Sequence, residues 1–386
     1  MPLIHPFMTV VGLAALVFAA GYAILNVIAI LVWRARTPTV PPDLRPPVTL
    51  LKPLCGSEPG LYEHLRSFCR QNYGEYQIVF GVRDRSDPAR HVVERLQAEF
   101  PDLPMQMVVN SKLHGSNYKV SNLINMIPYA RHDILVMADS DAFVRPDYLA
   151  SVTAPLVDPQ VGLVTCVYHG IPTETIWSRL GAMYINEWYM PSILLSWMFG
   201  YQGYVSGQTM CLRRATLDAI GGLKIIADDL ADDFRLGELI RDLGLNTYLS
   251  SYLVEGEHHE PEMESLTSHE VRWMSTIRVL RPRSFRGMFL TFIMPLATVG
   301  LVLALAGAWD KPVAGGLFVT AVIARLAMHF MHRLRGHRPM FADLWLVPVR
   351  DLLTCGVWGR SFFTSRVTWR GGEFHVNPDG VMRRLS

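Results

Sequence analysis

An Asp-Ser-Asp triplet, Asp139 to Asp141, directly follows the apolar run 134–138. Residues two apart in a strand point to the same side, so both carboxylates would project together from a strand end. Such a pair can bind a hard divalent cation, Mg²⁺ or Mn²⁺, whose other ligands are water and diphosphate oxygens. Asp-X-Asp also occurs by chance in surface turns, so other residues must decide between the two interpretations.

Two further acidic positions stand where a strand ends or a helix begins. Asp84 follows the apolar run 77–82, and Asp233 opens a helical pattern that continues to about residue 240. Each also has a simpler interpretation. Asp commonly initiates turns near Asp-Pro pairs such as Asp87-Pro88, and acidic residues commonly cap helix N-termini.

A basic segment follows at residues 268–287, where His269, Arg272 and Trp273 precede four more arginines in apolar sequence. An amphipathic helix lying on anionic lipid would have the same composition. The His- and Glu-rich stretch before it, 255–264, lacks the HExxH spacing of a zinc site and has no helical pattern. We therefore expect a solvated loop there.

The elements that must position these residues lie between about Pro47 and Arg286, where short apolar runs alternate with helical patterns. This alternation is typical of an α/β domain with a largely parallel sheet and helices on both faces. Ligands bind such sheets beyond the carboxyl ends of the strands, where Asp84 and Asp139 fall. Strands are predicted at 48–51, 77–82, 105–109, 133–138 and 161–168, and helices at 58–71, 88–100 and 120–127.

The first 36 residues are predicted to be a transmembrane anchor. No charged residue occurs from Phe7 to Trp33, which exceeds the roughly 20 residues that a spanning helix needs. A cleaved signal peptide is the alternative, but the segment lacks a basic start and its apolar stretch is longer than usual. Arg34 and Arg36 follow it, and by the positive-inside rule they place the next segment in the cytoplasm.

The C-terminal region is predicted to contain two or three more membrane helices. The uncharged run 288–309 and a third apolar run, 312–331, which carries Arg325 and His329 near its far end, predict a helical hairpin. The basic sequence 332–338 that follows is expected on the cytoplasmic side. The segment 341–358 is interrupted by charges and remains open as a short span, a re-entrant element or an interfacial helix. The predicted domains are 1–36, a cytoplasmic domain at 37–286 ending in an interfacial amphipathic helix, and a membrane region with a basic tail at 287–386.

The composition agrees with a mixed architecture. Of the 386 residues 50% are hydrophobic and 18% are charged, which is too apolar for a wholly soluble protein and too polar for a purely membrane-embedded bundle. A formal net charge of +2 gives no indication of nucleic-acid binding. The five cysteines form no CxxC pair and no metal-ligand spacing, which favours a reducing compartment.

In their order along nearly the whole chain, these features resemble the ceramide glucosyltransferase group of inverting GT-A glycosyltransferases, whose members carry an early Asp, an Asp-X-Asp pair, a later catalytic Asp and a Q/RxxRW motif. His269 departs from that motif, since it stands where the group has Gln or Arg. The resemblance implies an α/β, Rossmann-like GT-A enzyme that moves a hexose from a UDP-sugar to a membrane lipid. The implied roles are nucleotide-sugar binding by Asp84, Asp139, His269, Arg272 and Trp273, Mg²⁺ or Mn²⁺ binding by Asp139 and Asp141, and general-base catalysis by Asp233.

Segments 55–71, 117–126, 161–170 and 230–238 look closest to the bacterial hopanoid-biosynthesis glycosyltransferases. That resemblance implies transfer of N-acetylglucosamine from its UDP form to bacteriohopanetetrol at the bacterial inner membrane. The alternatives are a ceramide glucosyltransferase using UDP-glucose and, more remotely, a non-catalytic lipid-binding or scaffold protein. The apolar, aromatic segment 185–205 could form a wall that admits the lipid acceptor, or simply pack in a core.

Overall fold

The computed structural model describes residues 4–36, 45–307, 310–333, 339, 341–364, 366–369, 372–376 and 382–384. Two compact units are interleaved along the chain. The sheet unit comprises 36–169, 200–257 and 368–386, and the helical unit comprises 1–35, 170–199 and 258–367. The three consecutive domains expected from the sequence stay a prediction.

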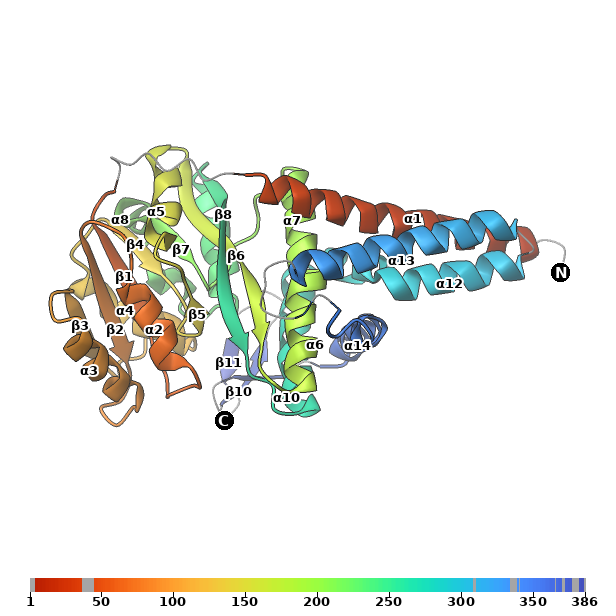
Figure 1. The fold of residues 1–386 in the computed structure, drawn as a ribbon. Coiled ribbons are helices and arrows are strands. Elements are labelled where there is room, and N and C mark those ends of the chain that lie inside the picture. Colours follow the sequence, from red (N-terminus) through yellow and green to blue (C-terminus); the bar gives the residue numbers. More distant parts are fainter. Residues whose placement is uncertain are drawn as a thin grey trace. The chain divides into compact units, whose positions relative to one another are not determined.

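The sheet unit is built on an eight-stranded sheet in the order β3-β2-β1-β4-β7-β6-β8-β5 (Figure 1). Its first four strands pair in parallel, but β7 runs antiparallel to both β4 and β6, and β5 antiparallel to β8. The strands are β1 (Val48–Pro53), β2 (Tyr76–Val82), β3 (Met105–Val109), β4 (Ile134–Met137), β5 (Ala142–Phe143), β6 (Val161–Pro172), β7 (Met210–Arg213) and β8 (Asn246–His258).

The α/β class is therefore confirmed, whereas the expectation of a largely parallel sheet is wrong beyond β4. The cause is β7, a four-residue strand that enters the sheet beside β4 in the reverse direction. A run as short as Met210–Arg213 has too few residues to show a strand period. The sequence patterns of the four parallel strands gave no sign of this reversal.

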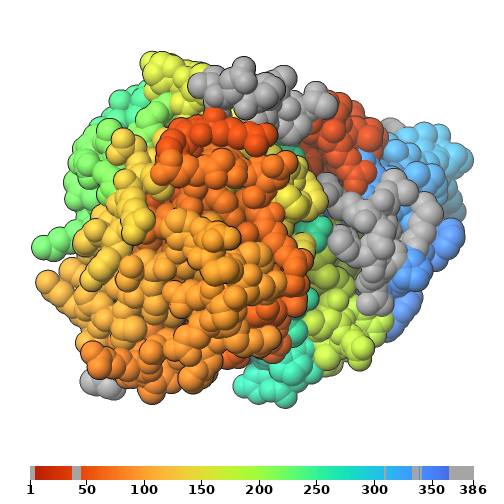
Figure 2. Space-filling model, turned by 60° about the vertical axis from the view of Figure 1, so that its left-hand side comes forward, coloured from red at the N-terminus to blue at the C-terminus, as the bar shows by residue number. Residues whose placement is uncertain are grey.

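Helices cover both faces of the sheet, as predicted. Neighbouring residues of β1 alternate between two cores, since Leu50 packs with Phe68 and Phe80 while Leu51 packs with Leu123 and others. Residues 50–110, orange in Figure 2, form a broad continuous face of this unit. The helices are α2 (Leu61–Cys69), α3 (Ala89–Glu99), α4 (Tyr118–Met126), α5 (Tyr148–Thr153), α8 (Arg214–Ala219) and α9 (Asp232–Asp242), with short 3₁₀ turns η1 (Ile127–Tyr129), η2 (Ala154–Val157) and η4 (Leu223–Ile226).

The helical unit contains the long apolar helices and the segments that pack on them (Figure 1). Its elements are α1 (Ile4–Arg34), α6 (Ile176–Tyr184), the π-helix η3 (Ile185–Tyr189), α7 (Met190–Met198), α10 (Met263–Leu280), α11 (Pro282–Gly287), η5 (Met288–Thr291), α12 (Ile293–Ala306), α13 (Lys311–Arg333) and α14 (Leu346–Ser361). A three-stranded sheet of β9 (Arg366–Trp369), β10 (Gly372–Val376) and β11 (Met382–Arg384) ends the chain.

Two helices are long and apolar enough to cross a membrane, His5–Arg34 and Lys311–His332. The run predicted as a further span, 288–309, instead breaks at Phe292, where segments 282–291 and 293–306 meet at 66°. The 14 residues of α12 reach about 21 Å, less than the roughly 30 Å of a hydrocarbon core. The two runs pack together as α12 and α13, as the predicted hairpin requires. Only α13 is a straight helix of full length, whereas the first run is long enough to cross a membrane only as the bent pair.

The helices α1 and α12 approach closely because of a glycine. A Cβ atom at Gly12 would lie 2.5 Å from the backbone nitrogen of Ala304. Small residues at such crossings let helix backbones pack within a membrane. We therefore expect α1 and α12 to stay packed against each other at Gly12 in a membrane.

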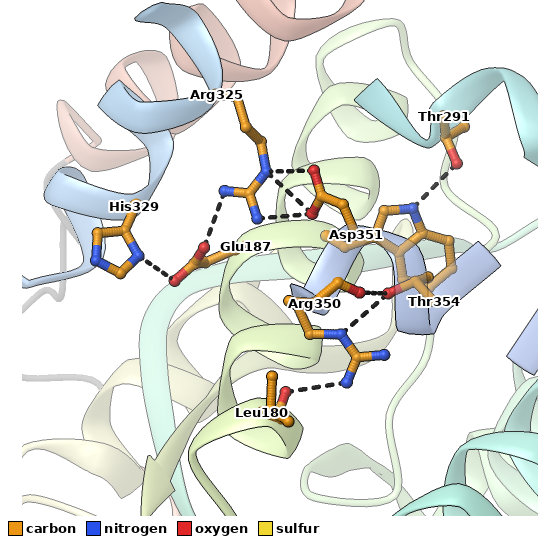
Figure 3. Close-up of polar contacts among 9 residues, drawn as sticks. Leu180, Glu187, Thr291, Arg325, His329, Arg350, Asp351 and Thr354 are labelled. Atoms are coloured by element: carbon orange, nitrogen blue, oxygen red, sulfur yellow. Dashed lines mark hydrogen bonds and ion pairs between the residues drawn. The ribbon is translucent and has the colours of Figure 1, made fainter. Parts of the chain in front are cut away.

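Buried ion pairs connect α13 and α14 to the rest of the helical unit (Figure 3). Arg325 of α13 donates to Glu187 of η3 at 2.9 Å and to Asp351 of α14 at 2.8 Å, and His329 contacts the other Glu187 oxygen at 2.7 Å. On α14, Arg350 donates to both oxygens of Glu270 in α10, at 2.6 and 2.8 Å. Charges in an apolar segment are thus satisfied inside the protein, as membrane helices require.

These pairs bear on two sequence expectations. Two of the charges that interrupt 341–358, Arg350 and Asp351, are buried on α14, and Asp343 in the turn before this helix pairs with Arg179. The 16 residues of α14 reach only about 24 Å, so this helix alone is too short to span a bilayer. Glu187, which interrupts the segment 185–205, is 3% exposed and anchors it. The predicted cytoplasmic loop 332–338 lies mostly outside the described residues.

Candidate functional site

The Asp-Ser-Asp triplet lies directly after β4, at the carboxyl end of the parallel strands, as the sequence predicted. The Asp139 carboxylate accepts a hydrogen bond from Lys119 Nζ at 2.7 Å, and its backbone carbonyl accepts one from Lys52 Nζ at 2.5 Å. Asp141 Oδ1 accepts from Gln208 Nε2 at 3.1 Å. Burial, then repulsion from Asp139, raises the pKa of Asp141 to about 6.

Asp233 belongs to the same group of side chains. It lies in the first turn of α9, where its Oδ2 accepts from the Gly207 backbone N–H at 2.9 Å and its Oδ1 accepts from the Phe234 N–H at 2.7 Å. Because Gly207 and Gln208 are adjacent, one short segment contacts both Asp233 and Asp141. Burial and the neighbouring Asp232 raise the pKa of Asp233 to about 6.

Lys119 is the cation at the centre of these acids. Besides Asp139, it contacts Asp232 Oδ2 at 3.3 Å. Burial would lower the pKa of Lys119, but the attraction of Asp139, Asp232 and Asp233 raises it well above its usual range. The lysine is therefore charged at neutral pH, and it reduces the repulsion among the carboxylates.

A second lysine, Lys52, contacts the backbone of the triplet. Its Nζ lies 3.6 Å from the centre of the Phe68 ring, and the residue is fully buried in β1. Burial lowers the pKa of Lys52 to about 7, against the attraction of Asp139 and Asp141. Its hydrogen bond to the Asp139 carbonyl fixes the backbone of the triplet.

The segment that joins the acids, Ser206 to Thr209, is a tightly bonded turn. The Ser206 N–H donates to Thr165 Oγ1 at 3.0 Å, and the Thr209 N–H donates to the Ser206 carbonyl at 3.0 Å. A Cβ at Gly207 would lie 2.7 Å from Lys119 Nζ and 2.8 Å from Asp139 Oδ2. Glycine is therefore the residue that fits where this turn passes the charged cluster.

Asp84 is exposed, in the turn after β2. Its Oδ1 accepts from both the backbone N–H and the hydroxyl of Ser86, each at 2.8 Å, and these bonds lower its pKa. The contacts of Asp84 are thus those of a residue that begins a turn. A role in nucleotide binding stays a prediction.

His269, Arg272 and Trp273 lie on α10, in the helical unit. The acidic cluster belongs to the sheet unit. Trp273 stacks on Tyr184 with ring centres 5.8 Å apart, and on the His269 ring at 6.3 Å. The three residues share one side of the helix by their spacing of three and four.

The segment 255–264 differs from the solvated loop expected there. The strand β8 continues to His258, and Glu260 is only 3% exposed. Two polar partners satisfy its buried carboxylate. It accepts from His269 Nδ1 at 2.7 Å and from the Ser265 hydroxyl at 2.5 Å. Burial would raise the pKa of Glu260, but these two hydrogen bonds hold it below its usual value.

Sequence reasoning missed four residues of the acidic cluster: Lys52, Lys119, Gly207 and Gln208. Lys119 and Asp232 meet across more than a hundred residues of chain, and no local pattern announces such a contact. A usable signal was the Gly-Gln pair between two apolar runs, since turns that pass close to other groups favour glycine.

The cluster can hold a divalent cation with two carboxylates. In the part of the chain that the structure describes, no group of three or more His, Cys, Asp or Glu side chains is placed to hold a metal. Asp139 and Asp141 nevertheless fit Mg²⁺ or Mn²⁺, because these ions keep waters and bind through one or two carboxylates plus substrate phosphates. The oxygen-only donor set also suits these hard cations.

Comparison with known proteins gives one family and several relatives. Residues 11–382 match the family model "Glycosyl transferase family 21". The chain is similar to ceramide glucosyltransferase 1 of Caenorhabditis elegans, with 20% identity over 97% of this chain and 82% of the relative. It also resembles ceramide glucosyltransferase of Candida albicans, with 31% identity over 26% of this chain and 21% of the relative.

One solved structure shares the fold over most of its length. It is the mannosyltransferase PcManGT from Pyrobaculum calidifontis, in complex with GDP-Man and Mn²⁺, with a TM-score of 0.52 and 18% identity. The match covers 92% of this chain and 98% of that chain. At this identity the likeness shows the fold alone.

Proposed function

Because the chain belongs to glycosyl transferase family 21, we propose that it is a ceramide glucosyltransferase that transfers glucose from UDP-glucose to a hydroxyl group of a ceramide. That it is a hexosyltransferase with a GT-A fold follows from its family and its structural relatives. One observation carries the site assignment: the turn at Gly207 and Gln208 holds Asp233 and Asp141 in one cluster at the end of the parallel strands.

The ceramide assignment replaces the hopanoid one as the leading proposal. The relatives that match most of the chain are ceramide glucosyltransferases, whereas none of those named above is a hopanoid enzyme. Transfer of N-acetylglucosamine to bacteriohopanetetrol, and with it a place in the bacterial inner membrane, has no support beyond the sequence segments that suggested it. Both proposals share the same chemistry at the sugar.

The proposed reaction is a single displacement at the anomeric carbon of the donor sugar. Asp233 takes the proton from the lipid hydroxyl as its oxygen attacks, and a pKa near 6 leaves this carboxylate ionised at neutral pH. The bond from the anomeric carbon to the diphosphate oxygen breaks, and UDP leaves with its electron pair. Attack on the face opposite the leaving group inverts the configuration.

Asp139 and Asp141 would hold the Mg²⁺ or Mn²⁺ ion, which neutralises charge on the diphosphate of the leaving UDP. Lys119 limits the repulsion between these carboxylates and the acids of α9. Gly207 orients Asp233 through its backbone N–H. These contacts fix the carboxylates before any substrate binds.

The remaining predicted residues have proposed roles in donor and acceptor binding. Arg272 and His269 would contact the diphosphate, Trp273 would close the acceptor side, and Asp84 would hold the uracil or ribose. The apolar helices would keep the enzyme at the bilayer, where its lipid acceptor resides. The basic residues Arg34 and Arg36 support a cytoplasmic catalytic side.

A matrix of donors and acceptors tests the proposal. The full-length protein in lipid vesicles with Mn²⁺ would be given UDP-glucose, UDP-galactose or UDP-N-acetylglucosamine, each with ceramide or bacteriohopanetetrol. We expect glucosylceramide as the main product by mass spectrometry. A product only with bacteriohopanetetrol would restore the hopanoid assignment, and no glycolipid from any pair would contradict both.

A further inference from the structure

We propose that Gln208 recognises the hexose that is transferred. Its side-chain carbonyl accepts a hydrogen bond from a hydroxyl group of that hexose. This inference rests on the proposed function and adds a specificity residue to it. Gln208 lies two residues before β7. Its side chain contacts Asp141, assigned to metal binding, and the neighbouring Gly207 contacts Asp233, assigned to catalysis. No sequence motif singled it out.

The two polar atoms of this side chain have different surroundings. Nε2 donates to Asp141 Oδ1 at 3.1 Å. Gln208 is only 9% exposed, and its Oε1 atom is shielded from solvent. This atom accepts no hydrogen bond from any residue that the structure describes. A buried acceptor without a donor is costly, so such an atom at an active site indicates a ligand that supplies one.

The orientation of the amide follows from its partner. An ionised carboxylate only accepts hydrogen bonds, so the amide group must turn its NH₂ towards Asp141. The opposite orientation would place two acceptors against each other. Oε1 is therefore the atom left to bind a ligand, and what it can bind is a donor such as a hydroxyl.

The backbone holds this acceptor in place. The Gln208 N–H donates to Ser206 Oγ at 3.3 Å, and its carbonyl accepts from Thr209 Oγ1 at 2.7 Å. Thr209 Oγ1 is further bonded to the Tyr148 hydroxyl at 3.0 Å, and Thr165 Oγ1 donates to the Thr209 carbonyl at 2.8 Å. A side chain on such a turn is preorganised, as a specificity contact requires.

The position of Gln208 indicates that the hydroxyl bound by Oε1 belongs to the sugar. Gln208 contacts Asp141, whose expected partner is the metal on the diphosphate, and Gly207 beside it contacts the proposed base. The group that lies between a diphosphate and a catalytic base in this reaction is the hexose. A water bound to the metal also carries O–H donors, and the experiment separates the two sources.

The test measures coupling between Gln208 and each sugar hydroxyl. The full-length wild type and Gln208→Met, which has similar length without the amide, are compared with UDP-glucose and its 2-, 3-, 4- and 6-deoxy analogues. We expect one deoxy analogue to lose about 10-fold or more in affinity and kcat/KM with the wild type. Gln208→Met should lose a similar factor with UDP-glucose and no longer distinguish that analogue.

If Gln208→Met keeps the wild-type ratio between UDP-glucose and every deoxy analogue, the proposal is wrong. A uniform loss for all donors, with a weakened dependence on Mn²⁺, would instead assign Oε1 to a metal-bound water and also overturn it. Gln160→Met, at an exposed position, is the matched control and should leave all ratios unchanged. Gln208→Asn, which withdraws the amide by one methylene, serves as a second variant if Gln208→Met unfolds.

Affinities are measured by calorimetry without acceptor, so the test does not depend on the lipid. If the wild type binds UDP-glucose with the expected hydroxyl dependence but forms no glucosylceramide, the acceptor assignment fails and the role of Gln208 stands. If UDP-glucose binds no better than UDP in the wild type and no deoxy analogue differs, the role of Gln208 is contradicted whatever the acceptor proves to be.

Discussion

At the scale of single residues, the raised pKa of Asp233 determines how activity depends on pH. A base must be ionised, so kcat/KM should rise with pH through about 6 and level off above it, rather than near the usual value of about 4. A pH profile with saturating Mn²⁺ measures this. An acid limb near pH 4 would contradict the buried environment of Asp233.

The raised pKa of Asp233 also makes the stability of the fold depend on pH, in the direction opposite to activity. A raised carboxyl pKa means that the folded chain binds this proton more tightly than the unfolded chain does. The contribution of Asp233 to the free energy of unfolding is therefore largest below about pH 4 and decreases as pH rises from about 4 to about 6. Activity and stability should thus change in opposite directions across this window.

Lys119 should affect that profile through its charge. Its positive charge lowers the pKa of Asp233, so Lys119→Met should move the acid limb of kcat/KM to a pH above 6. Activity at pH 7 should fall in consequence. Lys112→Met, at an exposed position, is the matched control and should leave the limb in place. An unmoved limb in Lys119→Met would exclude the proposed electrostatic role.

At the scale of elements, the turn before β7 should tolerate no side chain at Gly207. Gly207→Ala places a Cβ 2.7 Å from Lys119 Nζ and 2.8 Å from Asp139 Oδ2. Overpacking of this kind costs about 1–3 kcal/mol, and here the lysine and the carboxylate must move apart. We expect kcat/KM to fall by roughly 10-fold or more, since about 1.4 kcal/mol corresponds to a factor of ten.

Gly74→Ala is the control for that experiment, because a Cβ at Gly74 meets nothing within 4 Å. Steady-state kinetics on both variants, with a thermal-unfolding measurement for each, separates loss of activity from loss of fold. Wild-type kinetics in Gly207→Ala would show that the turn has more freedom than its contacts indicate.

The helix α14 should depend on its buried ion pair with α10. Arg350→Met leaves the Glu270 carboxylate buried without its partner, and breaking such a pair costs about 3–5 kcal/mol. Thermal unfolding in detergent should show a clearly lowered midpoint. The double variant Arg350→Met with Glu270→Met should recover much of the loss, and Arg360→Met, exposed on the same helix, should behave as wild type.

At the scale of the whole molecule, the sequence predicted those features that depend on local periodicity. The parallel strands from Val48 to Met137 and the carboxylates that follow β4 lie where their patterns place them. The antiparallel strand β7 was missed because four residues carry no period. The break at Phe292 was missed because an uncharged run does not reveal a bend of 66°.

The site was predictable in part for the same reason. Asp139 and Asp141 share one strand end, whereas Lys119, Gln208 and Asp233 meet them only through long-range contacts. Buried charges such as Arg325 looked like features of a membrane flank, because their partners Glu187 and Asp351 are distant in sequence. Pairing of charges is a property of the folded chain and not of any segment.

The most direct measurement of the central claim compares sugar transfer and UDP binding in Asp233→Asn. The side chain keeps its size but cannot take a proton, so transfer to ceramide should fall by about 10²–10⁴-fold. The affinity for UDP with Mn²⁺ should stay within a few fold of wild type, because Asp139 and Asp141 are unchanged. Undiminished glucosylceramide formation by Asp233→Asn, read by mass spectrometry, would contradict the account.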